Sequence, residues 1–186
     1  MEDYNKIQYN EKLDFYRLNV AQSRSAIVLD TTFKDDSFIV SSGIVNYAND
    51  VVKTKKDMGK RTYDLLAFND GMNKVISDKL LNLLIENEVI GFKTYPVDIK
   101  GVKEKYHGLQ VIGKSGKYMK PEKKEDNDDY SFKGVKFDPE TWDGSDIFFP
   151  EGTTALTITP RIKKILEENN ITNIEIEHIS DCLGFY

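Results

Sequence analysis

The sequence has few of the residues that build disulfide bonds and zinc sites. Its 186 residues include one cysteine, Cys182, and two histidines, His107 and His178. One cysteine excludes an intrachain disulfide, and neither histidine has a second His or Cys at the spacing of a zinc site. No apolar run approaches the roughly 20 residues that span a bilayer, and residues 1–6 lack the basic and apolar regions of a secretory signal. We therefore expect a cytoplasmic protein in which Cys182 is a small, buried or half-buried residue.

The composition is that of a globular protein with a moderate excess of acidic residues. Hydrophobic residues make up 39% of the chain and charged residues 31%, with a formal net charge of −5. This length favours one domain with a substantial core. Binding to phosphates needs clustered Lys and Arg, so the charge argues against a nucleic-acid partner and suits a basic protein partner.

A unit of apolar strand, capped helix and second strand occurs twice, with a constant offset of 82 residues and no gap. The first copy begins at Asp64 and the second at Asp146. Apolar positions coincide throughout, and five pairs of residues are identical: Asp64/Asp146, Ile76/Ile158, Leu84/Leu166, Glu86/Glu168 and Asn87/Asn169. Self-similarity at a fixed spacing indicates structural duplication, although two ordinary strand–helix–strand segments can share this pattern by chance.

Each copy carries the start and stop signals of a short helix. Ser77 and Thr159 are good N-caps, and Pro160 stands at the first helical position, where its missing amide costs nothing. Asn87 and Asn169 suit the left-handed position that ends a helix. If the strands before and after each helix share a sheet, they are parallel.

The remaining segments favour short strands without helices between them. We expect strands at 13–20, 26–29, 38–40, 106–112 and 130–137, an ambiguous stretch at 44–61 with a basic loop over 53–60, and an exposed charged loop over 114–129. This order favours an α+β class with mixed or antiparallel sheets, few short helices and two similar strand–helix–strand units. The single domain, 1–186, then divides into a β-rich part (1–60), a first repeat (61–113), a charged loop and strand (114–141) and a second repeat (142–186).

Residues 108–115 match the phosphate-binding string G-x-x-x-x-G-K-[ST] letter for letter. In a phosphate-binding loop the four central residues curve round the phosphate, and a helix starts at the lysine. Here the central residues, 109–112, favour a strand, and no amphipathic helix follows Lys114. We therefore expect a strand that ends in a glycine turn.

Asp64 and Asp146 are the candidate carboxylate pair, because the repeat relates them. The simpler interpretation is that each one caps a turn before an apolar stretch. The alternative is an enzyme of unknown type with its site between the two repeats. The acidic residues at 125–129 lack the glycine and the terminal glutamate of a calcium loop, so we expect neither a metal nor a cofactor.

Trp142 is the only tryptophan, and it precedes Phe148 and Phe149 closely in the sequence. Core packing explains such a cluster. An exposed anchor in a protein interface explains it as well, because Trp and Phe supply a large contact area.

Three segments of the second repeat, 142–149, 158–168 and 170–176, resemble a family of predicted immunity proteins of bacterial polymorphic toxin systems, formerly a domain of unknown function. Residues 75–80 and 92–97 of the first repeat are similar to the matching part of that family. The resemblance implies a cytoplasmic, non-enzymatic protein that binds a cognate toxin domain and blocks it. It supplies no catalytic residues.

This resemblance and the acidic charge together suggest an interface. An acidic rim would steer association with a basic toxin, so the interface candidates are Glu122, Glu125, Asp126, Asp128, Asp129 and Trp142. The expected partner is a toxin domain rather than a nucleic acid or a membrane. A scaffold module in a larger assembly is a further alternative.

Overall fold

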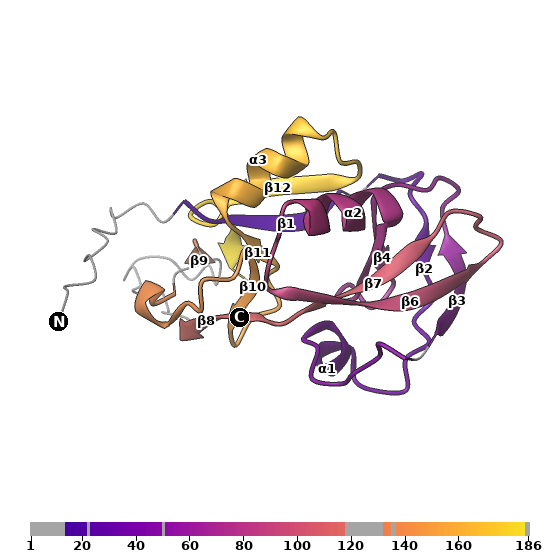
Figure 1. The fold of residues 1–186 in the computed structure, drawn as a ribbon, viewed down its shortest axis with the longest axis horizontal. Coiled ribbons are helices and arrows are strands. Elements are labelled where there is room, and N and C mark those ends of the chain that lie inside the picture. The colour runs from indigo at the N-terminus through magenta and orange to yellow at the C-terminus, as the bar shows by residue number, and fades with distance from the viewer. Residues whose placement is uncertain (1–13, 22, 50, 118–131, 135–136, 185–186) are drawn as a thin grey trace.

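The computed structural model describes residues 14–21, 23–49, 51–117, 132–134 and 137–184 (Figure 1). A closed barrel has the strand order β2 (Val28–Leu29), β3 (Val52–Met58), β6 (Phe92–Lys100), β7 (Tyr106–Val111), β5 (Lys74–Ser77) and β4 (Leu65–Phe68). A five-stranded sheet has the order β12 (Ile174–His178), β1 (Tyr16–Val20), β11 (Thr157–Ile158), β10 (Ile147–Glu151) and β8 (Gly113–Lys117). A small sheet pairs β9 (Phe132–Lys133) with β13 (Leu183–Gly184).

The helices are short. They are α1 (Ser37–Ser41), α2 (Asp78–Glu86), α3 (Pro160–Glu168) and the 3-10 turn η1 (Pro139–Thr141). In Figure 1, α2 and α3 lie on the same side of the molecule and α1 lies on the other side. Short helices and mixed sheets confirm the expected α+β class.

The two expected repeats have the same elements and the same strand register. Leu65 of β4 lies opposite Ile76 of β5, and the residues 82 positions later, Ile147 and Ile158, lie opposite each other in β10 and β11. The helices α2 and α3 correspond over their whole length. The strands on either side of each helix are parallel, because both pair antiparallel with one strand between them, β7 in the first repeat and β1 in the second.

These two middle strands are exchanged between the repeats. In chain order, the first repeat is β1, β2, β4, β5, α2 and β6, and the second is β7, β8, β10, β11, α3 and β12. Yet β1 lies in the sheet of the second repeat and β7 in the sheet of the first. The two strands also have equivalent registers. Leu18 of β1 lies opposite Ile176 of β12, and Leu109 of β7 lies opposite Thr94 of β6. Thr94 and Ile176 are equivalent positions, because they are 82 residues apart. Residues before 61 therefore supply two strands of the repeat pattern, which the sequence comparison missed.

The largest apolar cluster joins the two repeats through equivalent residues. Each helix contributes the stripe of apolar residues that its sequence predicts. The strands contribute apolar residues at equivalent positions of the two repeats. The equivalent pairs in the cluster are Leu65/Ile147, Ile76/Ile158, Leu80/Ile162, Leu84/Leu166, Val89/Ile171 and Leu109/Leu18. The repeats therefore share one core, and neither repeat buries its own helix alone.

The residue with left-handed backbone that follows each helix comes one position later than expected. Asn87 and Asn169 have ordinary φ angles of −95° and −97°, while Glu88 and Asn170 have positive φ angles of 51° and 49°. The asparagine side chains instead donate to the carbonyl group four residues earlier, each at 2.9 Å. The prediction that these asparagines hold the left-handed position is therefore wrong.

Two predictions in the N-terminal part are also wrong. Residues 38–40 belong to the helix α1, because Asp36 accepts a hydrogen bond from the amide of Phe38 at 2.9 Å and caps it. Residues 53–58 belong to β3 rather than to a basic loop. Val52 and Thr54 are buried there while the lysines between and after them are exposed, which is the alternation of a strand with one wet face.

The charged loop expected at 114–129 is also shorter than predicted at its start. Residues 114–117 form β8, which pairs parallel with β10. The rest of that loop, 118–129, lies outside the described residues, as does part of the strand expected at 130–137.

Candidate functional site

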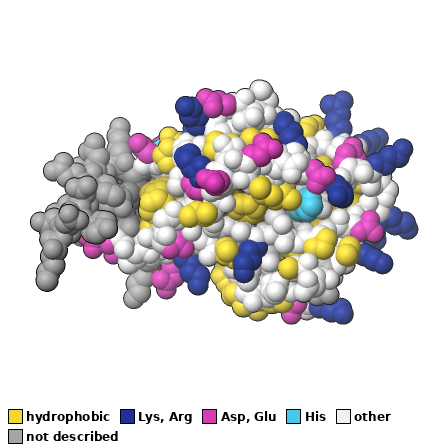
Figure 2. Space-filling view, viewed as in Figure 1, with side chains coloured by type: hydrophobic (Ala, Val, Ile, Leu, Met, Phe, Trp, Pro, Cys, Tyr) yellow, Lys and Arg dark blue, Asp and Glu magenta, His cyan; other side chains and the backbone are white. Residues whose placement is uncertain are grey.

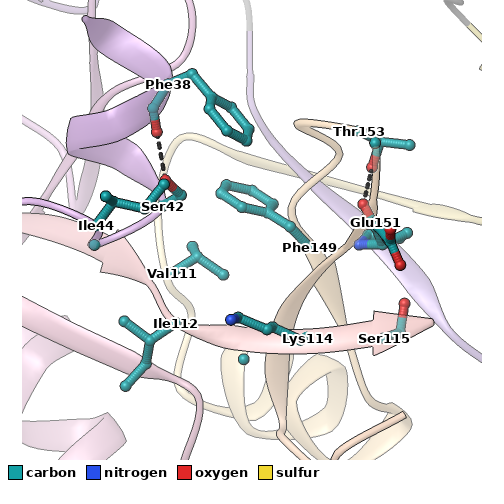
Figure 3. A pocket seen from close by; sticks show the side chains of 14 residues that line it. Phe38, Ser42, Ile44, Val111, Ile112, Lys114, Ser115, Phe149, Glu151 and Thr153 are labelled. Carbon is teal, nitrogen blue, oxygen red and sulfur yellow. Dashed lines mark hydrogen bonds between the residues drawn. The ribbon is translucent and has the colours of Figure 1, made fainter. Parts of the chain in front are cut away.

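A hollow of about 600 Å³, here called the apolar hollow, opens between α1, the junction of β7 and β8, and the end of β10 (Figure 3). Its apolar lining includes Phe38, Ile44, Val111, Ile112 and Phe149. Phe38 is 39% exposed and Ile44 is 69% exposed. Large apolar side chains that remain exposed round a concave surface mark interaction sites.

The helix α1 forms one wall of this hollow because β7 holds it there. Gln110 of β7 is 2% exposed, and its amide group donates to the carbonyl groups of Val40 at 2.8 Å and Val45 at 2.9 Å. Gly43 follows α1 with a φ of 67°, and a Cβ atom there would lie 2.6 Å from the side chain of Ile112. The close approach of α1 to the floor of the hollow therefore requires glycine at this position.

The floor of the apolar hollow contains a polar group without a partner. Ser115 is only 4% exposed, and its Oγ has no hydrogen-bond partner among the described residues. The hydroxyl of Thr153, which also lines the hollow, donates to the carbonyl group of Pro150 at 3.0 Å (Figure 3). A buried hydroxyl without a partner costs about 1–3 kcal/mol.

A second hollow of about 460 Å³, here called the charged hollow, occupies the equivalent place in the other sheet. It lies at the junction of β1 and β2 and beside β4 and β5. Its residues correspond through the repeat to those of the apolar hollow: Val20/Val111, Val28/Lys114, Ala67/Phe149 and Gly71/Thr153. The charged hollow differs in its lining, which includes Arg17, Lys74 and Glu175.

Asp64 connects the first repeat to the second. Its carboxylate accepts hydrogen bonds from the Ser77 hydroxyl at 2.8 Å, and from the amide and hydroxyl of Thr172 at 2.9 and 2.8 Å. The ammonium group of Lys79 lies 3.6 Å away. Burial acts to raise the pKa of Asp64, but the hydrogen bonds from Thr172 and Ser77 and the charge of Lys79 outweigh it, so that the pKa is lowered.

Asp146 makes the equivalent contacts from the second repeat to the first. Its carboxylate accepts from the Thr159 hydroxyl at 3.2 Å and from the amide of Ile90 at 3.2 Å. Arg161, at the position equivalent to Lys79, forms an ion pair with it. Ile90 is equivalent to Thr172, so the two aspartates form a reciprocal pair of clamps between the repeats. Both carboxylates thus have structural partners, and the lowered pKa of Asp64 is the opposite of what a general acid needs.

The structure places Trp142 within an aromatic cluster. Its ring centroid lies 5.1 Å from that of Phe15 and 5.9 Å from that of Phe148, and its indole N–H donates to the carbonyl group of Ser145 at 3.1 Å. The ring is half-buried, and Trp142 does not line the apolar hollow. The other interface candidates, Glu122, Glu125, Asp126, Asp128 and Asp129, lie outside the described residues.

Residues 108–111 of the string lie in β7, as their apolar character predicts, but the glycine turn expected after them is wrong, because Gly113 and Lys114 belong to the next strand, β8. Gly108 is required there for packing, because a Cβ atom would lie 1.9 Å from the ring of Tyr95. This strand geometry does not form the loop that cradles a phosphate.

Cys182 is buried, as the sequence predicts, and burial raises the pKa of its thiol to about 12. A thiol with so high a pKa is a poor nucleophile near neutral pH. His107 contacts Asp78 through Nε2 at 2.6 Å. Within the described part of the chain, no three His, Cys, Asp or Glu side chains gather as metal ligands.

Sequence reasoning missed both hollows, because their linings come from segments far apart in the chain. The apolar hollow combines residues 38–44, 111–115 and 149–153. The available signal was Gly43, which separates the serines at 41–42 from Ile44 and marks a turn beside apolar residues. A turn signal does not reveal which strand the turn will contact.

None of the helices among the described residues is long and apolar enough to cross a membrane. A scan against models of known protein families finds no match to this chain, and a search of curated proteins finds none either.

Proposed function

We propose that this chain is a non-enzymatic binding protein that neutralises a toxin domain by direct contact at the apolar hollow. The observation that carries the proposal is that two large apolar side chains, Phe38 and Ile44, remain exposed beside a hollow of about 600 Å³. Energetically important interface residues are large anchors that enter such hollows. A large aromatic side chain of the partner would fill this space and cover the apolar surface of Phe38 and Ile44.

The distribution of charge supports a basic partner. The chain carries a net charge of −5, yet Figure 2 shows Lys and Arg side chains gathered at the end of the molecule where β3 and β6 lie (Figure 1). Exposed lysines there include Lys53, Lys55, Lys56, Lys100, Lys103 and Lys105. A basic toxin domain would be repelled from that end and attracted to the rest of the surface, which carries the excess of acidic charge.

The proposal expects a toxin domain to be encoded beside the gene for this chain, and the test uses that domain. Co-expression of the chain should restore growth, and the two purified proteins should form a complex. Ile44→Asp places a charge at the mouth of the apolar hollow, and we expect at least about tenfold weaker binding and loss of protection. Ile85→Asp is the matched control, because Ile85 is 59% exposed on α2 and does not line the hollow.

Two outcomes would contradict the proposal at different levels. Failure of the unmodified chain to bind that toxin domain would overturn the function itself. Equal binding by Ile44→Asp and Ile85→Asp would leave the function in place and exclude the apolar hollow as the interface.

A further inference from the structure

We propose that the charged hollow is a binding site for a small oxyanion, a carboxylate or a phosphate, held by Arg17 and Lys74. The two cations come from different strands, β1 and β5, and line the same space of about 460 Å³. Pockets of this volume are within the range that holds small ligands. The site is independent of the apolar hollow and would remain whether or not the chain neutralises a toxin.

Neither cation has an acidic partner. The ammonium group of Lys74 donates to the carbonyl group of Met72 at 3.0 Å, and Nε of Arg17 donates to the side chain of Asn19 at 3.2 Å. No carboxylate among the described residues lies within ion-pair distance of either group. Asp70 acts on Lys74, and Glu177 lies opposite Arg17 in β12, but neither carboxylate forms an ion pair with these cations. A bound anion would give both half-buried cations a direct counter-ion.

The repeat shows that Lys74 is not needed for packing. Among the buried residues of the large apolar cluster, all but one have an apolar counterpart in the other repeat, and the exception is Leu156, whose counterpart is Lys74. Likewise, Arg17 occupies the register position of Gly108. Stability favours an apolar residue where the other copy has a buried leucine. Departures from the packing pattern are therefore expected at functional sites.

The electrostatic surroundings of Lys74 support an anion rather than a cation. Burial lowers the pKa of Lys74 to about 8; Asp70 acts to raise this value and Arg17 acts to lower it. Asp70 is already engaged by hydrogen bonds from Asn73 at 2.8 Å and Ser37 at 2.9 Å. An oxyanion between Arg17 and Lys74 would stabilise the positive charges of both side chains at once.

One acidic residue limits which ligands fit. Glu175 of β12 is exposed at the wall of the charged hollow. Its charge opposes a ligand with several negative groups, so the site suits a single oxyanion group. The side chain of Asn19 and the hydroxyl of Ser23 supply further polar contacts within the same lining.

The experiment measures binding of inorganic phosphate and of acetate to the full chain by calorimetry at pH 7. We expect binding of at least one probe at millimolar concentration, and the stronger probe identifies whether the natural ligand carries a phosphate or a carboxylate. Lys74→Leu and Arg17→Gln should each weaken binding at least about tenfold, as expected for the loss of a charge-assisted hydrogen bond. Glu175→Gln should strengthen it.

Two controls separate binding from folding and from net charge. Lys74→Leu restores the residue type of the other repeat, so its melting temperature should equal or exceed that of the unmodified chain. Lys56→Leu makes the same change of charge on exposed β3 and should leave binding unchanged.

The pH dependence gives a further readout. Because the binding form of Lys74 is protonated, affinity should fall as the pH rises through about 8. Arg17, Asp70 and Glu175 are the other charged groups beside Lys74. Absence of binding by the unmodified chain, or equal binding by Lys74→Leu, would overturn the proposal.

Discussion

Asp64 and Asp146 illustrate how single residues hold the two repeats together. Each carboxylate accepts a hydrogen bond from a backbone amide of the opposite repeat. Asp64 accepts from Thr172 and Asp146 accepts from Ile90, and these two donors occupy equivalent positions. A charge-assisted hydrogen bond contributes about 1.5–3 kcal/mol, roughly twice as much as a neutral one. The sequence reveals that these aspartates are equivalent, but it cannot reveal that their partners lie in the other copy.

Removal of the charge at Asp64 should destabilise the fold in a pH-dependent way. Because the pKa of Asp64 is lower in the folded chain than its ordinary value, its ionised form stabilises the fold above that value and loses this contribution as the pH falls. We expect Asp64→Asn to lower the free energy of unfolding by about 2–4 kcal/mol at pH 7. The difference from the unmodified chain should shrink in acid.

Urea denaturation at pH 7 and at acid pH measures this difference. A deficit for Asp64→Asn that stays constant with pH would mean that the charge of Asp64 does not contribute, and that only its shape does.

At the scale of elements, the two helix starts differ although their sequences predict the same role. The Ser77 hydroxyl accepts from the amide of Leu80 at 3.2 Å and donates to Asp64. The Thr159 hydroxyl makes no cap bond and donates only to Asp146. Pro160 begins α3 with a fixed φ, so that helix depends less on a side-chain cap.

Ser77→Ala should therefore cost more stability than Thr159→Ala. The first change removes a cap and a clamp contact together, for which we expect about 1–2 kcal/mol. The second removes one side-chain hydrogen bond, for which we expect about 0.5–1 kcal/mol. Thermal or urea unfolding of both variants measures the order, and the reverse order would contradict this interpretation of the two caps.

The helices α2 and α3 were predictable from the sequence because their signals are local. The caps at Ser77 and Thr159 and the apolar stripes fix α2 and α3 within one residue. The strand β3 was not predictable, because its lysines resemble a solvated loop until β6 provides a partner. Likewise, α1 depends on a distant contact with Gln110. Elements that depend on long-range partners carry weak signals of their own.

At the scale of the whole molecule, the exchange of β1 and β7 makes the two repeats interdependent. Each sheet has its middle strand supplied by the other repeat. Each half also buries its helix in the shared apolar cluster. A half of the chain alone lacks a central strand and leaves a helix uncovered.

Separate halves should therefore not fold alone but should fold together. We expect a fragment ending at the exposed turn after β6, near residue 103, and a second fragment containing the rest to lack cooperative unfolding when purified separately. Mixed or co-expressed, they should associate and recover the far-ultraviolet circular dichroism of the intact chain. Cooperative unfolding of either fragment as a monomer would show that the exchanged strands are dispensable.

The sequence by itself determined the duplication, the two amphipathic helices with their caps, the buried cysteine and the α+β class, because each follows from residue types at short, regular spacings. Only the tertiary structure decided which sheet receives β1 and β7, which partners Asp64 and Asp146 clamp, and where the two hollows open. These features depend on contacts between segments far apart in the chain. Many pairings of equivalent strands satisfy the same local pattern, and only burial of the whole shared core selects one of them.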